Sequence, residues 1–395
     1  MRFSIPLTVD KHAAASCPLP RRRDVLRWVA AVGLAGCGRS APGDDLLDRI
    51  DEACRSAARA LIAAQSADGA WRSPTYGVFR DGLTLTPAVL KAVVFGPDVP
   101  GADQARRRGA AYLASRIRDD GSIDDGPTGL VYPVYTAAAS ALALTRVPVA
   151  GGAKARDAWL SEVRRRQLDE SLGWGPDDPA YGGWGYAIEA SRKGNTSAPD
   201  ADLSSTLFAV GALGVANRSG DGPALAKALR FVERCQNFAG GDGGFFFSPT
   251  DPVRNKAGAA GPGRFHSYGS ATADGLRALL RCGLGIDHPR VVAARGWLAR
   301  NFSAATNPGA FEPIREPERE ATYYYYAWSF AHAARALGRG HGLRLDELAR
   351  ELIRRRRTDG TWANRFTASK EDDPLVATSF AAGALGLCRL AIAPA

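Results

Sequence analysis

The sequence predicts an all-α protein, an (α/α)6 toroid built from six helical hairpins. Amphipathic, arginine-rich segments of helical periodicity alternate with segments rich in Ala, Gly, Leu, Ser and Thr, and the pair recurs about every 50 to 70 residues. A helix with one polar face belongs at the surface, whereas a helix that is apolar on most sides must be covered. Because neither end of the array has the polar outer face of a capping repeat, the six pairs are expected to close into a double ring.

The first helix of each hairpin is expected in the outer ring and the second in the inner ring. The outer helices are predicted at residues 44–66, 103–118, 153–168, 222–237, 288–302 and 343–357. The inner helices are predicted at residues 83–96, 130–147, 200–217, 266–283, 321–338 and 374–391. Residues 44–391 are therefore predicted to form one toroid domain.

A short phrase that ends in Gly and an aromatic residue follows several of the outer helices. It reads LIAAQSADGAW at 61–71, QNFAGGDGGF at 236–245 and RTDGTW at 357–362. Asp-Gly is typical of a tight turn with a positive φ angle at glycine. The aromatic side chain that follows is expected to pack back under its own hairpin.

Within the first phrase, Gln65, Gly69 and Trp71 resemble the QW motif of squalene-hopene cyclases and related prenyltransferase-repeat proteins. Further copies are read at Gln167, Gly173 and Trp174 and at Gln236, Gly243 and Phe245. The resemblance covers residues 44–391 and implies an α/α toroid whose Gln and Trp side chains tie adjacent helices together. The QW motif by itself is uninformative about the reaction.

The amino-terminal segment has the pattern of an export signal. Basic residues Arg21 to Arg23 precede a short apolar stretch, Trp28 to Ala35, that is too short to span a bilayer. Arg22 and Arg23 resemble a twin-arginine signal, and the sequence LAGC ending at Cys37 resembles a bacterial lipobox. We therefore predict a lipoprotein signal peptide at 1–37, a tether at 38–43, and a lipid anchor on Cys37 that holds the exported protein at the periplasmic face of the cell envelope. The alternative is a cytosolic protein with a basic start.

Charge and cysteine content argue against several classes of protein. The formal net charge is +10, but six basic and only two acidic residues lie within 1–37, and the remaining arginines are spread over the outward faces of helices. This pattern favours a solvated surface over nucleic-acid binding. The later cysteines, Cys54, Cys235, Cys282 and Cys388, lie far apart in apolar helical pattern, and the chain has five histidines. We expect buried thiols, no metal site and no cofactor.

In a closed ring of this kind, the amino-terminal ends of the inner helices border the central cavity. Asp200 and Asp202 lie at one such end and match in part the Asp-x-Asp-Asp-Thr motif with which squalene-hopene cyclases protonate a polyene. Leu203 and Ser204 replace the rest of the motif, which reduces the crowding of carboxyl groups that makes a strong acid. The resemblance implies Asp202 as the acid and Asp200 as its partner. The alternative is that Asp202 is an N-cap for the amide groups of Ser204 or Ser205.

Two further inner helices begin with polar or aromatic residues. His266 is a candidate base or carboxyl-orienting group, and Tyr268 follows it. Four tyrosines, Tyr323 to Tyr326, sweep most of the way around a helix, so only Tyr325 or Tyr326, aligned with Thr322, is expected to face the cavity. Aromatic faces can stabilise a carbocation. The alternatives are core packing for the tyrosines and a solvated loop position for His266.

The long loop at 173–198 combines aromatic side chains with carboxyl groups. It contains Trp174, Tyr181, Trp184 and Tyr186 together with Asp177 and Asp178. Exposed aromatics beside paired carboxylates suit sugar binding and glycosidic cleavage, with Trp184 as a candidate ligand contact. The alternative is a loop that folds over the ring mouth on its own aromatics.

Taken together, the residues and the resemblance predict a cyclase-like or isomerase-like enzyme that acts on an isoprenoid or similar apolar lipid. A non-catalytic envelope module that binds lipid, glycan or peptide is the first alternative, and a glycan-cleaving enzyme is the second. The chain has residues for one helical ring, whereas the cyclases that it resembles have two helical domains.

Overall fold

The computed structural model describes residues 42–126, 129–195, 199–216 and 219–393. The predicted signal peptide, the lipid-anchor residue Cys37 and nearly all of the tether lie outside the described residues. Everything below concerns the compact unit that begins at Pro42.

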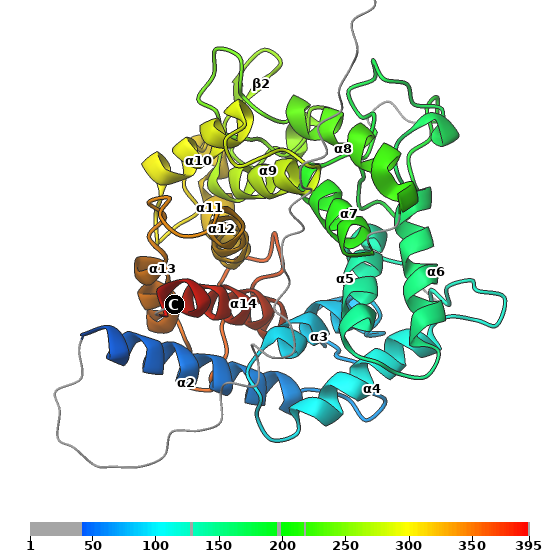
Figure 1. Ribbon diagram of the computed structural model, residues 1–395, viewed down its shortest axis with the longest axis vertical. Helices are drawn as coiled ribbons and strands as arrows, with labels where there is room; N and C mark the ends of the chain where they lie inside the picture. The colour runs from blue at the N-terminus through cyan, green and yellow to red at the C-terminus, as the bar shows by residue number, and fades with distance from the viewer. Residues whose placement is uncertain (1–41, 127–128, 196–198, 217–218, 394–395) are drawn as a thin grey trace, which may run out of the picture. The chain divides into compact units, whose positions relative to one another are not determined.

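Two concentric rings of helices make up this unit (Figure 1). The inner ring consists of α3 (Leu85–Phe95), α5 (Pro133–Arg146), α7 (Leu203–Ala216), α9 (Gly269–Arg281), α12 (Tyr323–Leu337) and α14 (Pro374–Ile392). The outer ring consists of α2 (Pro42–Ala63), α4 (Ala102–Ser115), α6 (Gly152–Arg165), α8 (Gly222–Arg234), α10 (Pro289–Asn301) and α13 (Leu345–Arg354). Each inner helix packs against the next, and α14 packs against α3, so the ring closes. The predicted (α/α)6 toroid is confirmed.

Shorter elements that the sequence analysis did not predict lie in the loops. They are η2 (Gly77–Phe79), η3 (Glu170–Leu172), η4 (Ser219–Asp221), η5 (Pro252–Arg254), η6 (Pro313–Arg315), α11 (Glu316–Ala321) and the antiparallel strands β1 (Ala259–Gly261) and β2 (Arg264–Phe265). Most of them precede an inner helix in the chain, so they lie on the side of the ring where the inner helices begin. This placement brings loop residues over the helix ends that were expected to carry the site.

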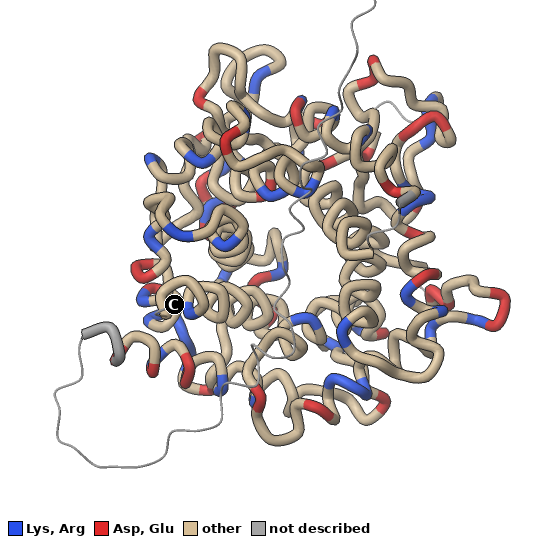
Figure 2. Tube along the Cα trace, in the orientation of Figure 1, with Lys and Arg blue, Asp and Glu red and all other residues tan. Residues whose placement is uncertain are grey.

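Small residues in the inner ring allow aromatic side chains and helices to approach closely. A Cβ atom at Gly275, in the middle of α9, would lie 2.3 Å from the ring of Phe245. The outer helices instead carry the charged residues of both signs that follow the periphery in Figure 2, while the inner helices are mostly uncharged. This distribution is the one that amphipathic outer helices and covered inner helices require.

Where the repeated turn carries a glutamine, it connects neighbouring helices. In the first unit, Gln65 Nε2 donates to the carbonyl of Gly69 at 2.9 Å and to that of Ala105 on the next outer helix at 2.9 Å. The indole of Trp71 donates to Leu61 O at 2.6 Å, and its backbone N–H donates to Thr86 Oγ1 in α3 at 2.8 Å. One turn thus joins its own hairpin to the following one.

The third unit corrects one sequence reading. Gln167 Nε2 donates to Gly182 O at 3.0 Å and to Ala224 O at 2.9 Å, and the Trp184 indole donates to Val163 O at 2.8 Å. The glycine and tryptophan of this unit are therefore Gly182 and Trp184, and the reading of Gly173 and Trp174 was wrong. The sequence offers both pairs, because residues 168–181 form an insertion between the glutamine and its turn.

Among the described residues, α14 is long and apolar enough to cross a membrane by length and composition. In this fold it is the last inner helix, and it contacts α2, α3, α12 and α13. These contacts account for its apolar surface within the ring.

Candidate active site

Aromatic side chains from helices on different sides of the ring meet at its centre. The ring of Tyr135 (α5) lies 4.9 Å from that of Phe208 (α7), and Phe208 lies 5.7 Å from Trp328 (α12). Tyr325 (α12) follows at 5.8 Å from Trp328 and 5.4 Å from Phe380 (α14). We call these five residues the aromatic lining. All but Trp328 remain partly exposed although helices surround them, so they border accessible space inside the ring.

Asp202 lies directly before α7 and is completely buried. Its carboxylate accepts hydrogen bonds from the backbone N–H of Ser205 at 2.7 Å, from the hydroxyl of Ser205 at 2.8 Å and from that of Ser204 at 2.9 Å. The capping role that was the alternative reading of this residue is therefore present. Capping alone does not describe the site, because the same carboxylate has a cationic partner.

That partner is Arg254, which the sequence analysis did not single out. Its guanidinium lies 3.0 Å from Asp202 Oδ2 and forms a second ion pair with Asp200. Arg254 ends η5, more than 50 residues along the chain, and no spacing in the sequence connects it to the aspartates. Asp200 also accepts a hydrogen bond from the backbone N–H of Ala187 at 2.5 Å. Arg254 thus lies between the two aspartates and pairs with both.

The environment of Asp202 raises the pKa of its carboxyl group. Burial raises the pKa of this carboxyl group to about 6, the positive charge of Arg254 opposes the rise, and the negative charge of Asp200 adds to it. A carboxyl group with such a pKa can be protonated in a weakly acidic medium, as a general acid must be.

A hydrogen-bond chain leads from Asp202 to the aromatic lining. Ser204 Oγ donates to Asp202 Oδ1 at 2.9 Å and lies 2.5 Å from the hydroxyl of Tyr135. We call Asp202, Ser204 and Tyr135 the acid relay. It gives a fully buried acid a connection to the centre of the ring without direct exposure.

A second buried carboxyl group, Asp274, lies in the middle of α9. It accepts a hydrogen bond from the Tyr325 hydroxyl at 2.7 Å, another from Ser329, and forms an ion pair with Arg277 at 3.4 Å. Burial raises its pKa. The sequence analysis missed Asp274, although a carboxylate in the middle of an inner helix was a signal that could have found it. The aromatic lining therefore contains two tyrosines, each linked to a different buried carboxyl group.

Of the other predicted site residues, only Tyr325 faces the centre. The hydroxyl of Tyr326 donates to Ser303 O at 3.0 Å, and that of Thr322 donates to Glu318 O at 2.8 Å. Tyr268 is buried with its ring 5.7 Å from that of Phe311. Trp184 is buried in the repeated turn. These four side chains hold the ring together and do not line its centre.

His266 lies between β2 and α9 and is half-buried. Among the described residues, no hydrogen bond connects its side chain to Asp200 or Asp202. Within the same part of the chain, no group of three or more His, Cys, Asp or Glu side chains is placed to hold a metal ion. The four described cysteines are free thiols; Cys54, Cys235 and Cys388 are buried, as predicted, whereas Cys282 is half-buried.

The described part of the long loop, residues 173–195, packs on its own aromatic side chains. Trp174 donates to Ser191 O at 2.8 Å, and Tyr181 donates to Glu170 at 2.6 Å. Asp178 pairs with Lys193 at 2.7 Å and is not part of a carboxylate pair over a ligand site. Tyr186 stacks on the guanidinium of Arg254 at 4.2 Å. The loop thus covers the aspartates, which was the alternative reading, and its tryptophans are not available to stack on a sugar.

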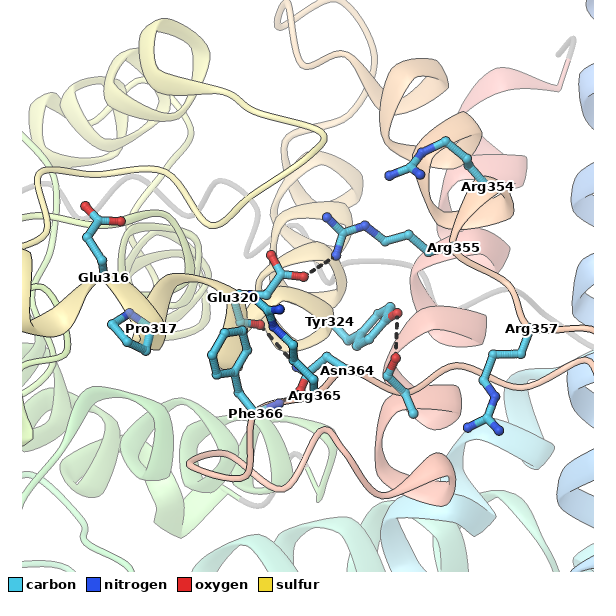
Figure 3. A pocket seen from close by; sticks show the side chains of 11 residues that line it. Glu316, Pro317, Glu320, Tyr324, Arg354, Arg355, Arg357, Asn364, Arg365 and Phe366 are labelled. Carbon is cyan, nitrogen blue, oxygen red and sulfur yellow. Dashed lines mark hydrogen bonds and ion pairs between the residues drawn. The ribbon is translucent and has the colours of Figure 1, made fainter.

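A surface pocket of about 890 Å³ lies elsewhere, between α11, the start of α12 and the end of α13 (Figure 3). Arg354, Arg355, Arg357 and Arg365 line it together with Glu316 and Glu320. Arg355 is held by Glu320 at 2.5 Å and Glu351 at 2.8 Å. None of the lining residues belongs to the acid relay or contacts Asp274, so this pocket is separate from the candidate site.

Comparison with known proteins extends the description of the fold. No protein-family model and no curated protein matches the chain. A variant of the type II terpene cyclase MstE from Scytonema, in complex with the product merosterolic acid A, has a TM-score of 0.59 at 11% identity, over 88% of this chain and 99% of that one. Another MstE variant, in complex with the substrate geranylgeranyl dihydroxybenzoate, has a TM-score of 0.54 at 12% identity with the same coverage.

A glycosidase variant has the same fold, with a TM-score of 0.51 at 13% identity over 90% of this chain and all of that chain. The helical toroid is thus the one found in type II terpene cyclases and in glycosidases. Identities this low describe the fold alone, so the chemistry has to be argued from the residues at the centre of the ring.

Proposed function

We propose that this protein is a terpenoid cyclase-like or isomerase-like enzyme that acts on an unsaturated, apolar lipid at the centre of its ring. The observation that carries the proposal is the acid relay, in which the buried carboxyl group of Asp202 is linked through Ser204 to Tyr135 in the aromatic lining. A binding module has no need of a buried acid with a raised pKa that is connected to its ligand space.

The proposed reaction begins with protonation of a carbon–carbon double bond. Protonated Asp202 supplies the proton through Ser204 and the hydroxyl of Tyr135, and a positive charge develops on the substrate. The faces of Tyr325 and Phe380, two partly exposed members of the aromatic lining, stabilise that charge. Loss of a proton from a neighbouring carbon to the Tyr325 and Asp274 pair completes an isomerisation or cyclisation with no net change in composition. Returning that proton to Asp202 through solvent restores the enzyme.

The resemblance of the fold supports a substrate of this class. The MstE structures contain an isoprenoid conjugate as substrate and a cyclised product, each within a toroid like this one. Here the acid is paired with Arg254 and capped by serines, so the substrate is expected to be one that a moderate acid can protonate. A conjugated or electron-rich double bond meets that requirement better than an isolated one.

We also propose that the protein is exported and anchored by a lipid on Cys37, outside the described residues. Replacement of Cys37 by Ser tests this proposal. The parent protein should incorporate a labelled fatty acid and sediment with membranes, whereas the variant should do neither. Label on the variant, or on neither protein, would contradict the anchor.

The function is tested with the full-length protein in detergent, incubated separately with polyprenoids, including squalene and geranylgeranyl conjugates, and with polysaccharides. Mass spectrometry and chromatography should detect an isomer of one polyprenoid, and Asp202→Asn should abolish its formation while the variant remains folded. Recovery of bound, unchanged lipid from both proteins would instead support the binding module. Release of oligosaccharides would support glycan cleavage.

A further inference from the structure

Lys91 projects from α3 toward the aromatic lining and lacks an anionic partner. Its Nζ atom lies 4.3 Å from the centroid of Trp328 and 5.3 Å from that of Phe208. It makes no hydrogen bond or ion pair with any residue that the structure describes. The side chain is partly exposed, which means that its amine borders the accessible space at the centre of the ring.

The charges around Lys91 are predominantly positive. Burial, together with the positive charges of Arg277 and Arg281 on α9, lowers the pKa of Lys91 to about 7. Burial, with the same two arginines and Lys91, also holds the pKa of His332 on α12 well below its usual value. The guanidinium of Arg277 lies 4.6 Å from the centroid of Trp328, the same ring that Lys91 contacts. Two cations therefore share one indole.

Among the described residues, the nearby carboxyl group of Asp274 pairs with Arg277 and forms no ion pair with Lys91. Asp274 is already engaged by Tyr325, Ser329 and Arg277. Moving an ammonium group out of water without a counter-charge costs several kcal/mol, and a cation–π contact contributes about 0.5 to 2 kcal/mol. The protonated form of Lys91 is thus unfavourable in the free protein, which its lowered pKa reflects, and a ligand that supplies negative charge would stabilise that form.

We infer that Lys91, within the positive field of Arg277 and Arg281, binds the anionic head group of an amphiphilic ligand whose apolar part lies against the aromatic lining. The head group is a carboxylate or a phosphate. The ligand is oriented with its anionic end at Lys91 and its apolar part toward Tyr135, where the acid relay ends. This inference depends on the proposed function only in assuming that the apolar part occupies the same space.

The test measures binding of palmitate, hexadecyl phosphate, hexadecanol and inorganic phosphate to the full-length protein by calorimetry near pH 6. The parent protein should bind the two amphiphilic anions at least tenfold more tightly than hexadecanol. Lys91→Met should remove that preference, Lys91→Arg should keep it, and Lys154→Met, on the outer face of α6, should behave like the parent. Affinity for the anions should fall as the pH rises through about 7, while affinity for hexadecanol should not.

An equal loss of palmitate and hexadecanol binding in Lys91→Met would overturn the inference, because it would make Lys91 a packing residue. Equal affinity for inorganic phosphate and hexadecyl phosphate would overturn the assignment of an amphiphile, and so would absence of binding of every probe to the parent. Lys91-dependent binding without turnover of any polyprenoid would refute the proposed enzyme and leave this inference standing.

Discussion

The hydroxyl of Tyr135 lies 2.5 Å from Ser204 Oγ, and this contact connects two neighbouring inner helices. Tyr135 is in the first turn of α5 and Ser204 is in the first turn of α7. Because Ser204 also donates to Asp202, the packing of α5 on α7 is what brings the buried acid to the centre of the ring. The contact between these two residues is therefore a sensitive place to test the mechanism.

Replacing Tyr135 by Phe removes the last hydroxyl of the acid relay and keeps the ring that packs on Phe208. If the relay delivers the proton, turnover should fall by about 10²-fold or more, the usual contribution of a general acid. The free energy of unfolding should change by about 1 kcal/mol or less, because Ser204 keeps its bond to Asp202. Product formation and urea unfolding measure the two effects. The control is Tyr324→Phe, because the hydroxyl of Tyr324 lies outside the site, 3.5 Å from Ala363 O. Unchanged turnover in Tyr135→Phe would rule out the relay.

The raised pKa of Asp202 predicts two pH dependences. As a general acid Asp202 must be protonated, so turnover should fall as the pH rises above about 6. The folded-state pKa is higher than the unfolded one, so the folded protein binds the proton more tightly. The stability from this group is full below about pH 4 and is lost as the pH rises through about 6.

Asp202→Asn removes the titrating group, so comparing it with the parent isolates the contribution of Asp202 to the pH dependence of stability. Relative to the variant, the parent should lose stability between about pH 4 and 6.5, as measured by urea unfolding at several pH values. Parallel curves for the two proteins would show that Asp202 does not titrate in this range. The variant should still cap α7 through its side-chain oxygen, so it is expected to fold.

Gly182 is required by a close approach between the repeated turn and the next outer helix. Its φ angle is +86°, and a Cβ atom there would lie 2.0 Å from the carbonyl oxygen of Lys227. Gly194 has a similar φ angle, +91°, but a Cβ atom at that residue would meet nothing within 4 Å. Gly194→Ala should therefore cost only the backbone strain, about 1 kcal/mol.

Gly182→Ala should cost at least about 3 kcal/mol or prevent folding, because Lys227 O belongs to the backbone of α8 and cannot turn aside. Thermal unfolding of the two variants side by side separates steric overlap from strain. Equal losses would mean that the turn can move away from α8, and that the close approach is not needed for ring assembly.

Glu371 caps α12 from the loop before α14. Its carboxyl oxygens accept hydrogen bonds from the backbone N–H groups of Tyr324 at 2.9 Å and Tyr325 at 2.7 Å. Burial raises its pKa to about 8, although the two N–H donors oppose the rise. Glu371→Gln points an amide N–H at one of those donors and should destabilise the fold by about 1 to 3 kcal/mol.

The deficit of Glu371→Gln should depend on pH in a defined direction. In the parent, stability from a group with a raised pKa is full below about pH 4.5 and is lost as the pH rises through about 8. The difference between parent and variant should therefore be largest near pH 5 and smaller near pH 8.5, as measured by chemical unfolding. A difference that grows with pH would mean that the ionised carboxylate is the capping form.

The inner and outer helices were predictable because each had a clear chemical signature. α8 carries arginines on one side and apolar residues on the other, while α7 has no charged residue at all, and this contrast recurs around the ring. Asp202 was predictable as well, since a helix start preceded by a short acidic segment is a local feature. Its capping bond involves residues only two and three positions away.

The partners of these groups were not predictable, because they come from distant parts of the chain. Arg254 reaches Asp202 across 52 residues, and Tyr135 reaches Ser204 across 69. The choice of Tyr325 over Tyr326 depended on the rotation of α12 against α9 and α14, since both residues fit the same helical pattern. Trp174 and Trp184 likewise both followed a glycine, and only the position of α8 decided which of them completed the turn.

By itself the sequence determined the succession of twelve helices, their division into charged outer and apolar inner members, and the position of one acidic helix start. Periodicity and capping act over a few residues, so they can be read along the chain. Only the tertiary structure decided which cation faces which carboxylate, that Asp274 and Lys91 share the centre of the ring with five aromatic residues, and that His266 lies apart from them. Those relationships arise when helices far apart in the chain close into a ring. The strengths of the ion pairs and the pKa shifts depend on burial and on distances between side chains, and neither can be read from neighbouring residues in the sequence.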